Sequence, residues 1–86
     1  MVRADLVRPT VHLNGTAAEV LTQQYVVAAQ AVRDAMAAHA EAWPNGRDYY
    51  PQGPEAAQRA QDQAEERRSK LAEVLEELEE LAFGVH

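Results

Sequence analysis

Four consecutive residues, Arg47, Asp48, Tyr49 and Tyr50, form the densest group of chemically useful side chains in the sequence. They lie in an eleven-residue stretch, PNGRDYYPQGP at 44–54, which holds three of the four prolines of the chain. An arginine fork can bind phosphate or carboxylate through two parallel hydrogen bonds, and a tyrosine offers a flat apolar face with a polar tip. The stretch therefore predicts a binding surface.

The two tyrosines allow two interpretations, because a connector between helices needs only about 2–8 residues and this one is longer and stiff. In the first, the rings of Tyr49 and Tyr50 cover the end of the helices by packing with Trp43, and the Tyr50–Pro51 bond is then a candidate cis peptide. In the second, the rings form a stacking platform for a base or a nicotinamide-like ring. Both hold if one ring packs and the other stays exposed.

A second polar group lies in the segment HLNGT at 12–16. His12 and Asn14 can donate hydrogen bonds to a ligand. In a pair of antiparallel helices this segment lies at the end opposite the loop 44–53. The two groups therefore form one site only if another subunit brings its own segment to the loop.

Groups suited to catalysis or metal binding are scarce. The chain has no cysteine and a single serine, Ser69, in a polar stretch without a histidine near it in sequence. Its three histidines, His12, His39 and His86, have no metal-ligand spacing, and we expect His39 to be a packed or hydrogen-bonded helix residue. We predict no catalytic residue, no metal and no cofactor, and therefore no enzyme.

Charge and hydropathy limit the partners. The formal net charge of −6 argues against wrapping of DNA or RNA, and acidic helices do not suit a membrane surface. No apolar run is long enough for a bilayer span or a signal peptide, so we expect a cytoplasmic protein. Seven of the eight basic residues are arginine. This excess reflects either coding bias or phosphate-binding forks, for which Arg47 is the best candidate.

Two helices with an N-terminal arm are expected to position these residues within a single domain, 1–86. Residues 1–15 lack helical periodicity and predict an extended arm that packs Val11 and Leu13. Thr16 and Glu19 match a capping box for a helix over 17–42, which the proline after Trp43 ends. Pro54, suited to a first helical turn, begins a second helix over 54–82.

Apolar stripes on both helices predict an all-α fold, a long antiparallel two-helix hairpin with the extended arm. Seventeen of the forty hydrophobic residues are alanine, which buries little area. One such hairpin would offset chain entropy poorly, so we expect a homo-oligomer.

Several glutamates crowd the last turns of the second helix, where negative charge opposes the helix macrodipole. They either form a solvated face or are partly neutralised by Arg3 and Arg8 of the arm. We predict the neutralised arrangement. The glutamates are Glu73, Glu76, Glu77, Glu79 and Glu80.

The motifs VHLNGT at 11–16 and PNGRDYYPQGP at 44–54, each opening a long helix, resemble those of a group of short phage-encoded proteins. In size and hairpin design the chain is also similar to the sponges with which phages counter nucleotide-signalling immunity, the anti-CBASS and anti-Thoeris sequestering proteins. This resemblance implies a homo-oligomer in the cytoplasm of an infected or lysogenic bacterium. It also implies binding, without cleavage, of a cyclic oligonucleotide or an ADP-ribose derivative.

In that role Arg47 would hold a phosphate and Tyr49 or Tyr50 would stack on a base. Asp48 or Asn14 would bind the ribose or base edges. The alternative, from a different class, is a structural or partner-binding hairpin, such as a virion assembly factor or an inhibitor of a host protein.

Overall fold

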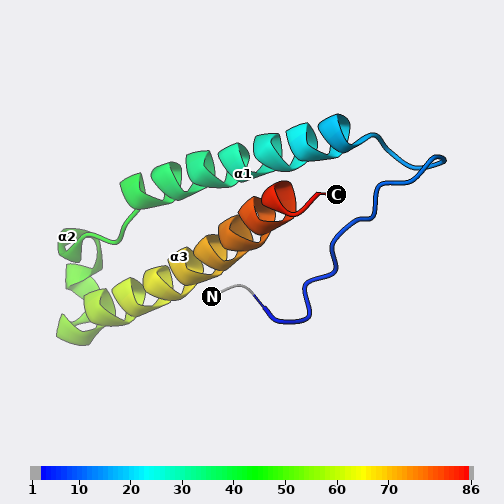
Figure 1. Ribbon diagram of the computed structural model, residues 1–86. Coiled ribbons are helices and arrows are strands. Elements are labelled where there is room, and N and C mark those ends of the chain that lie inside the picture. The colour runs from blue at the N-terminus through cyan, green and yellow to red at the C-terminus, as the bar shows by residue number, and fades with distance from the viewer. Residues whose placement is uncertain (1–2, 86) are drawn as a thin grey trace.

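A computed structural model describes residues 3–85 of the chain, so residues 1–2 of the expected arm and His86 lie outside the described part. Two long α-helices, α1 (Ala18–Glu41) and α3 (Pro54–Phe83), lie side by side and run in opposite directions (Figure 1). A short helix, α2 (Gly46–Tyr49), and a 3-10 turn, η1 (Tyr50–Gln52), connect them. Residues 3–85 contain no strand, which confirms the prediction of an all-α chain.

Helix α1 begins one residue later than the sequence predicted, at Ala18 instead of residue 17. Ala17, with an extended backbone (φ −60°, ψ 148°), is the N-cap residue, and no side chain caps the helix. The predicted capping box of Thr16 and Glu19 is therefore wrong, because Thr16 lies one position outside the helix. Glu19 still falls in the first turn, where a negative charge is favourable for the macrodipole.

Most of the segment between the long helices is helical, from Gly46 to Gln52, where the sequence predicted a stiff loop over 44–53. The side-chain Oδ1 of Asn45 accepts a hydrogen bond from the backbone N of Arg47 at 3.0 Å, which caps α2. Pro51 lies in the first turn of η1, where it needs no hydrogen-bonded N–H. Gly53 ends the turn with φ 102°, a backbone conformation that side-chain-bearing residues rarely adopt.

The interface between the helices is built from small side chains. Among residues 3–85 the buried hydrophobic residues are Ala29, Ala56 and Ala64. No larger apolar side chain is buried there, because two helices alone cannot enclose one from all sides. The structure measures 61 × 23 × 16 Å, consistent with this thin, elongated arrangement.

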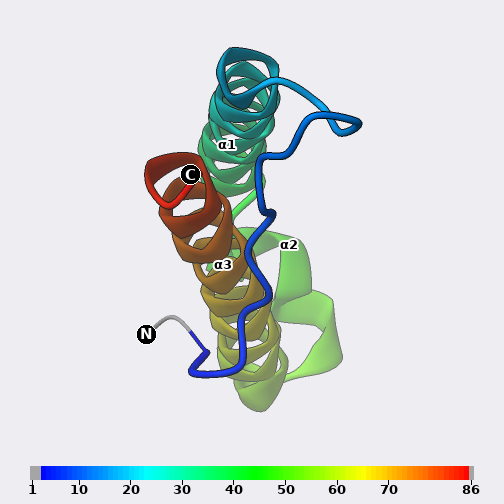
Figure 2. The same cartoon turned by 45° about the vertical axis from the view of Figure 1, so that its right-hand side comes forward.

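The arm runs alongside α3, turns at residues 12–15 and then leads into α1, as the two views show (Figures 1 and 2). Its turn is closed by a hydrogen bond from the backbone N of Gly15 to the backbone O of His12 at 3.0 Å. Val11 is half-buried, but Leu13 is 97% exposed, so the predicted packing of Leu13 is wrong. The leucine lies at the tip of the turn, which carries it away from both helices.

Arginines of the arm reach the acidic end of α3, as predicted. Arg8 Nη1 donates to the backbone oxygen of Glu80 at 3.0 Å, and its Nη2 donates to Oε1 of the same residue at 2.7 Å. Arg3 Nε lies 4.0 Å from Oε1 of Glu77. The Arg8 side chain also lies so close to Gly84 that a Cβ there would fall 2.5 Å from Nη1. The arm thus neutralises part of the charge at the end of the helix.

Candidate functional site

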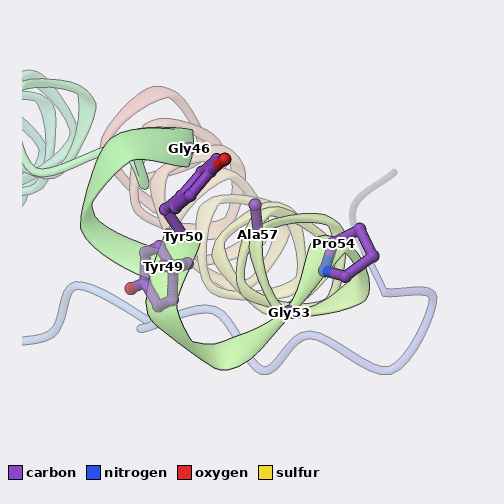
Figure 3. Close-up of a pocket in the computed structure, with 6 residues that line it drawn as sticks. All are labelled: Gly46, Tyr49, Tyr50, Gly53, Pro54 and Ala57. Carbon is purple, nitrogen blue, oxygen red and sulfur yellow. The ribbon is translucent and has the colours of Figure 1, made fainter.

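The helical turn formed by α2 and η1 lies against the first turns of α3 and encloses a pocket of about 550 Å³. Both tyrosine rings project from this turn, in different directions (Figure 3). The lining residues come from α2, η1 and the start of α3: Gly46, Tyr49, Tyr50, Gly53, Pro54 and Ala57. The lining is therefore apolar apart from backbone groups and the two phenol hydroxyls. Such a surface suits a flat ring better than an ion.

The two tyrosines have different environments. Tyr49 is half-buried, whereas the Tyr50 side chain is 84% exposed. Neither packs on Trp43, whose ring instead meets His39 edge-on at 5.7 Å between ring centroids. The Tyr50–Pro51 peptide is trans, so the candidate cis bond is wrong. The structure therefore leaves one ring packed and the other open to solvent.

Arg47 and Asp48 are exposed and do not line the pocket. Arg47 follows Gly46 directly, which places its backbone at the pocket rim. Within residues 3–85 its guanidinium forms no ion pair or hydrogen bond. The two residues expected to bind phosphate and ribose are thus beside the pocket rather than in it.

Five of the seven arginines have side-chain partners in the described structure. Carboxylates pair with Arg3, Arg8, Arg33 and Arg68, and Arg67 Nε donates to His39 Nε2 at 3.3 Å. The two without such a partner among residues 3–85 are Arg47 and Arg59. Both belong to the segment around the tyrosine pocket, so free guanidinium groups are concentrated where the rings are.

His12 and Asn14 are exposed in the turn of the arm, at the far end of the molecule from α2 (Figure 1). The imidazole of His12 lies over Gly15, where a Cβ would fall 2.8 Å from Nε2. The structure does not bring these two residues to the tyrosines within one chain. They can share a site with the pocket only through another copy.

Sequence reasoning missed a second hollow that Tyr49 also lines. Its volume is about 230 Å³, and its lining residues are Tyr49, Gln52, Ala56, Arg59, Ala60 and Gln63. The signal was present in the sequence: 56, 59, 60 and 63 have the i, i+3, i+4, i+7 spacing of one helix face.

His39, expected to be packed or hydrogen-bonded, is both. It is half-buried against Trp43 and accepts the hydrogen bond from Arg67. No group of three histidine, aspartate or glutamate residues suited to a metal ion occurs among residues 3–85. Nor does any helix in that range have the length and apolar character needed to cross a membrane.

Among residues 3–85, the carboxyl groups with lowered pKa values, those of Asp5 and Glu65, do not line the pocket. A hydrogen bond and the charge of Arg3 lower the pKa of Asp5 in the arm. In the middle of α3, the hydrogen bond from Arg68 lowers the pKa of Glu65. Both side chains belong to exposed ion pairs, a structural arrangement rather than an acid–base pair for catalysis.

Comparison of the chain with protein-family models, with curated proteins and with solved structures finds no match.

Proposed function

We propose that this protein binds and sequesters a nucleotide-derived signal without cleaving it. The observation that carries the proposal is the apolar pocket beside Tyr49 and Tyr50, with free arginine side chains on the same segment. Its volume of about 550 Å³ falls in the range typical of small-molecule sites. A heterocyclic ring fits the apolar part, and an anionic group fits an arginine.

The energetics of such a site are favourable even in an acidic protein. Stacking of a base on an aromatic side chain contributes about 1–3 kcal/mol, and a charged hydrogen bond about 1.5–3 kcal/mol. Tyr50 is available for stacking because its ring is exposed. Arg47 at the rim would hold a phosphate, and Asp48 would bind ribose or a base edge.

Self-association is the second part of the proposal. We take the antiparallel α1–α3 hairpin as the unit and a homo-oligomer as the functional form. The support is the exposure of large apolar side chains, because the buried hydrophobic residues within 3–85 are all alanine. These side chains include Val20, Val26, Val27, Val74 and Phe83. Assembly would cover them, and a neighbouring copy would bring His12 and Asn14 to the pocket.

The resemblance to short phage proteins and to phage sponges supports a role for this binding in immune evasion. The ligand would then be a cyclic oligonucleotide or an ADP-ribose derivative, in the cytoplasm of an infected bacterium. Sequestration requires tight binding and no turnover, and tyrosine and arginine supply an aromatic face and hydrogen-bond donors for that binding.

The test is titration calorimetry of the full chain with cyclic dinucleotides, cyclic trinucleotides and ADP-ribose derivatives. We expect one of these classes to bind. Tyr50→Ala should then weaken binding by about 1–3 kcal/mol through lost stacking, and the matched control Tyr50→Phe should retain it. An absence of binding across the panel, or equal affinities of Tyr50→Ala and the unmodified chain, would overturn the proposal.

A second candidate function, a structural or partner-binding hairpin, is favoured by a different observation. A shallow groove of about 320 Å³ lies between α1 and the end of α3, lined by Thr22, Val26, Ala29, Arg33, Glu79, Ala82 and Phe83. Phe83 beside it is 88% exposed. Sedimentation separates the two functions: a stable homo-oligomer supports sequestration, whereas a persistent monomer leaves this apolar surface for another protein.

A further inference from the structure

Tyr49 lines two hollows of different chemistry. The first is the apolar pocket that it shares with Tyr50. The second is the polar hollow of about 230 Å³ lined by Gln52, Arg59 and Gln63 together with two alanines, Ala56 and Ala60. A molecule with a flat ring and a separate polar group can therefore contact both hollows, which share the Tyr49 side chain.

Four of the residues that line the polar hollow share one face of α3. Ala56, Arg59, Ala60 and Gln63 follow the spacing i, i+3, i+4 and i+7, so Arg59 and Gln63 lie one turn apart on that face. Ala56 is 6% exposed, and the small alanine side chains leave space beside Arg59. Gln52 lines the hollow from η1.

Arg59 is not engaged elsewhere in the described structure. The acids that helical spacing would offer it are Glu55, four residues before, and Asp62, three residues after. Asp62 Oδ1 instead accepts a hydrogen bond from Gln58 Nε2 at 2.9 Å. Within residues 3–85 the guanidinium of Arg59 has no ion pair or hydrogen bond, and no carboxylate lines the hollow.

The donors around the hollow suit a tetrahedral anion. A guanidinium presents five N–H donors in a fixed fork, and each glutamine amide adds two. Phosphate oxygens accept several hydrogen bonds at once, and arginine binds them bidentately. The neutral amides add hydrogen-bond donors without bringing a negative charge close to the anion.

We propose that this hollow binds the phosphate or diphosphate group of the ligand whose ring lies in the apolar pocket, with Arg59 as its main contact. This assignment rests on the proposed function for the ring. It specifies the chemistry of the ligand, which is a ring joined to a phosphate group through a linker long enough to pass Tyr49. Arg47, at the rim of the other pocket, then serves a different anionic group of the ligand.

The experiment uses inorganic pyrophosphate, which has no ring, so that it tests the hollow independently of the apolar pocket. The full chain is titrated at constant ionic strength, set with chloride, while backbone amide resonances are followed by NMR. We expect saturable shifts centred on the amides of the polar hollow, from Gln52 to Gln63. Arg59→Gln should weaken this binding at least about tenfold, as expected for a lost charged hydrogen bond.

The matched control is Arg67→Gln, which removes the same charge from the same helix but lies outside the hollow. It should change the affinity by less than about twofold, the scale of long-range screening between exposed charges. Equal effects of the two variants, or shifts spread over all the arginines, would overturn the anion site.

The failures of the two proposals are distinguishable. If a nucleotide of the panel binds through Tyr50 and its affinity is unchanged by Arg59→Gln, the anion site is wrong and the proposed function stands. If pyrophosphate binds at Arg59 but no nucleotide of the panel binds, the anion site stands and the proposed function is wrong.

Discussion

The two ends of the molecule use the same side-chain chemistry in opposite ways. At the arm end, formed by residues 3–17 and 77–85, Arg8 is joined to the last turns of α3 through both a backbone oxygen and a carboxylate. At the loop end, formed by residues 43–63, Arg47 and Arg59 have no such partner in the described structure. An arginine that already binds a group of the protein has few donors left for a ligand. A binding site is therefore expected where the arginines have no protein partner.

Packing differs between the ends as well. At the loop end, α2 and η1 lie against α3 and help to bury Ala56. At the arm end, Leu13 and Phe83 are almost fully exposed. The loop end is thus closed by the chain itself, whereas the arm end offers apolar area that another copy would cover.

The largest expected effect on stability comes from enlarging a buried alanine between α1 and α3. Ala64 is fully buried between the helices, so Ala64→Leu should force α1 and α3 apart and lower the free energy of unfolding by about 1–3 kcal/mol. Chemical denaturation followed by circular dichroism measures this. The matched control is Ala37→Leu on the exposed side of α1, which should change stability by less than about 0.5 kcal/mol. An equal stability of both variants would show that the two helices are not tightly packed around Ala64.

Helical content and the arm contacts followed directly from the sequence. The helices span nearly the ranges that the apolar spacing indicated, because Pro44 and Pro54 mark their boundaries clearly. The contact between Arg8 and Glu80 was predictable because excess negative charge at a helix C-terminus attracts a nearby cation. Such signals are local or depend on simple charge balance.

The details of the site were not predictable in the same way. The helical shape of 46–52 depends on the Asn45 cap and on the backbone of Gly53, which single-residue preferences do not reveal. The place of Arg59 depends on how η1 lies across α3, a tertiary arrangement. For the same reason the sequence singled out Arg47, which has the right neighbours, and overlooked Arg59, which faces the hollow.

A smaller effect distinguishes the structural arginines from the free ones. Arg8→Ala removes two hydrogen bonds to Glu80 and should lower stability by about 1 kcal/mol, less at high salt because the pair is partly exposed. Arg47→Ala should leave stability within about 0.5 kcal/mol of the unmodified chain and weaken ligand binding instead. Thermal unfolding at two salt concentrations measures the stability of both variants, and calorimetry measures the ligand affinity of Arg47→Ala. The contrast between the two ends fails if Arg47→Ala destabilises the fold as much as Arg8→Ala.

The smallest effect is the acid response of the arm. The pKa of Asp5 is lowered mainly by its hydrogen bond to Arg3, so this pair contributes at pH values above the ordinary pKa of aspartate. The contribution is lost as the pH falls through the lowered value, because protonation removes the charge that Arg3 contacts. Acidification from about pH 5 to pH 3 should therefore shift the amide resonances of residues 3–8, and Asp5→Asn should show most of that shift already at pH 7. The free arginines of the loop end contact no carboxylate that could respond in this way. A matching response of Arg59 and Gln63 to Asp5→Asn would mean that the two ends are coupled, and that the arm acts on the site as well as on the end of α3.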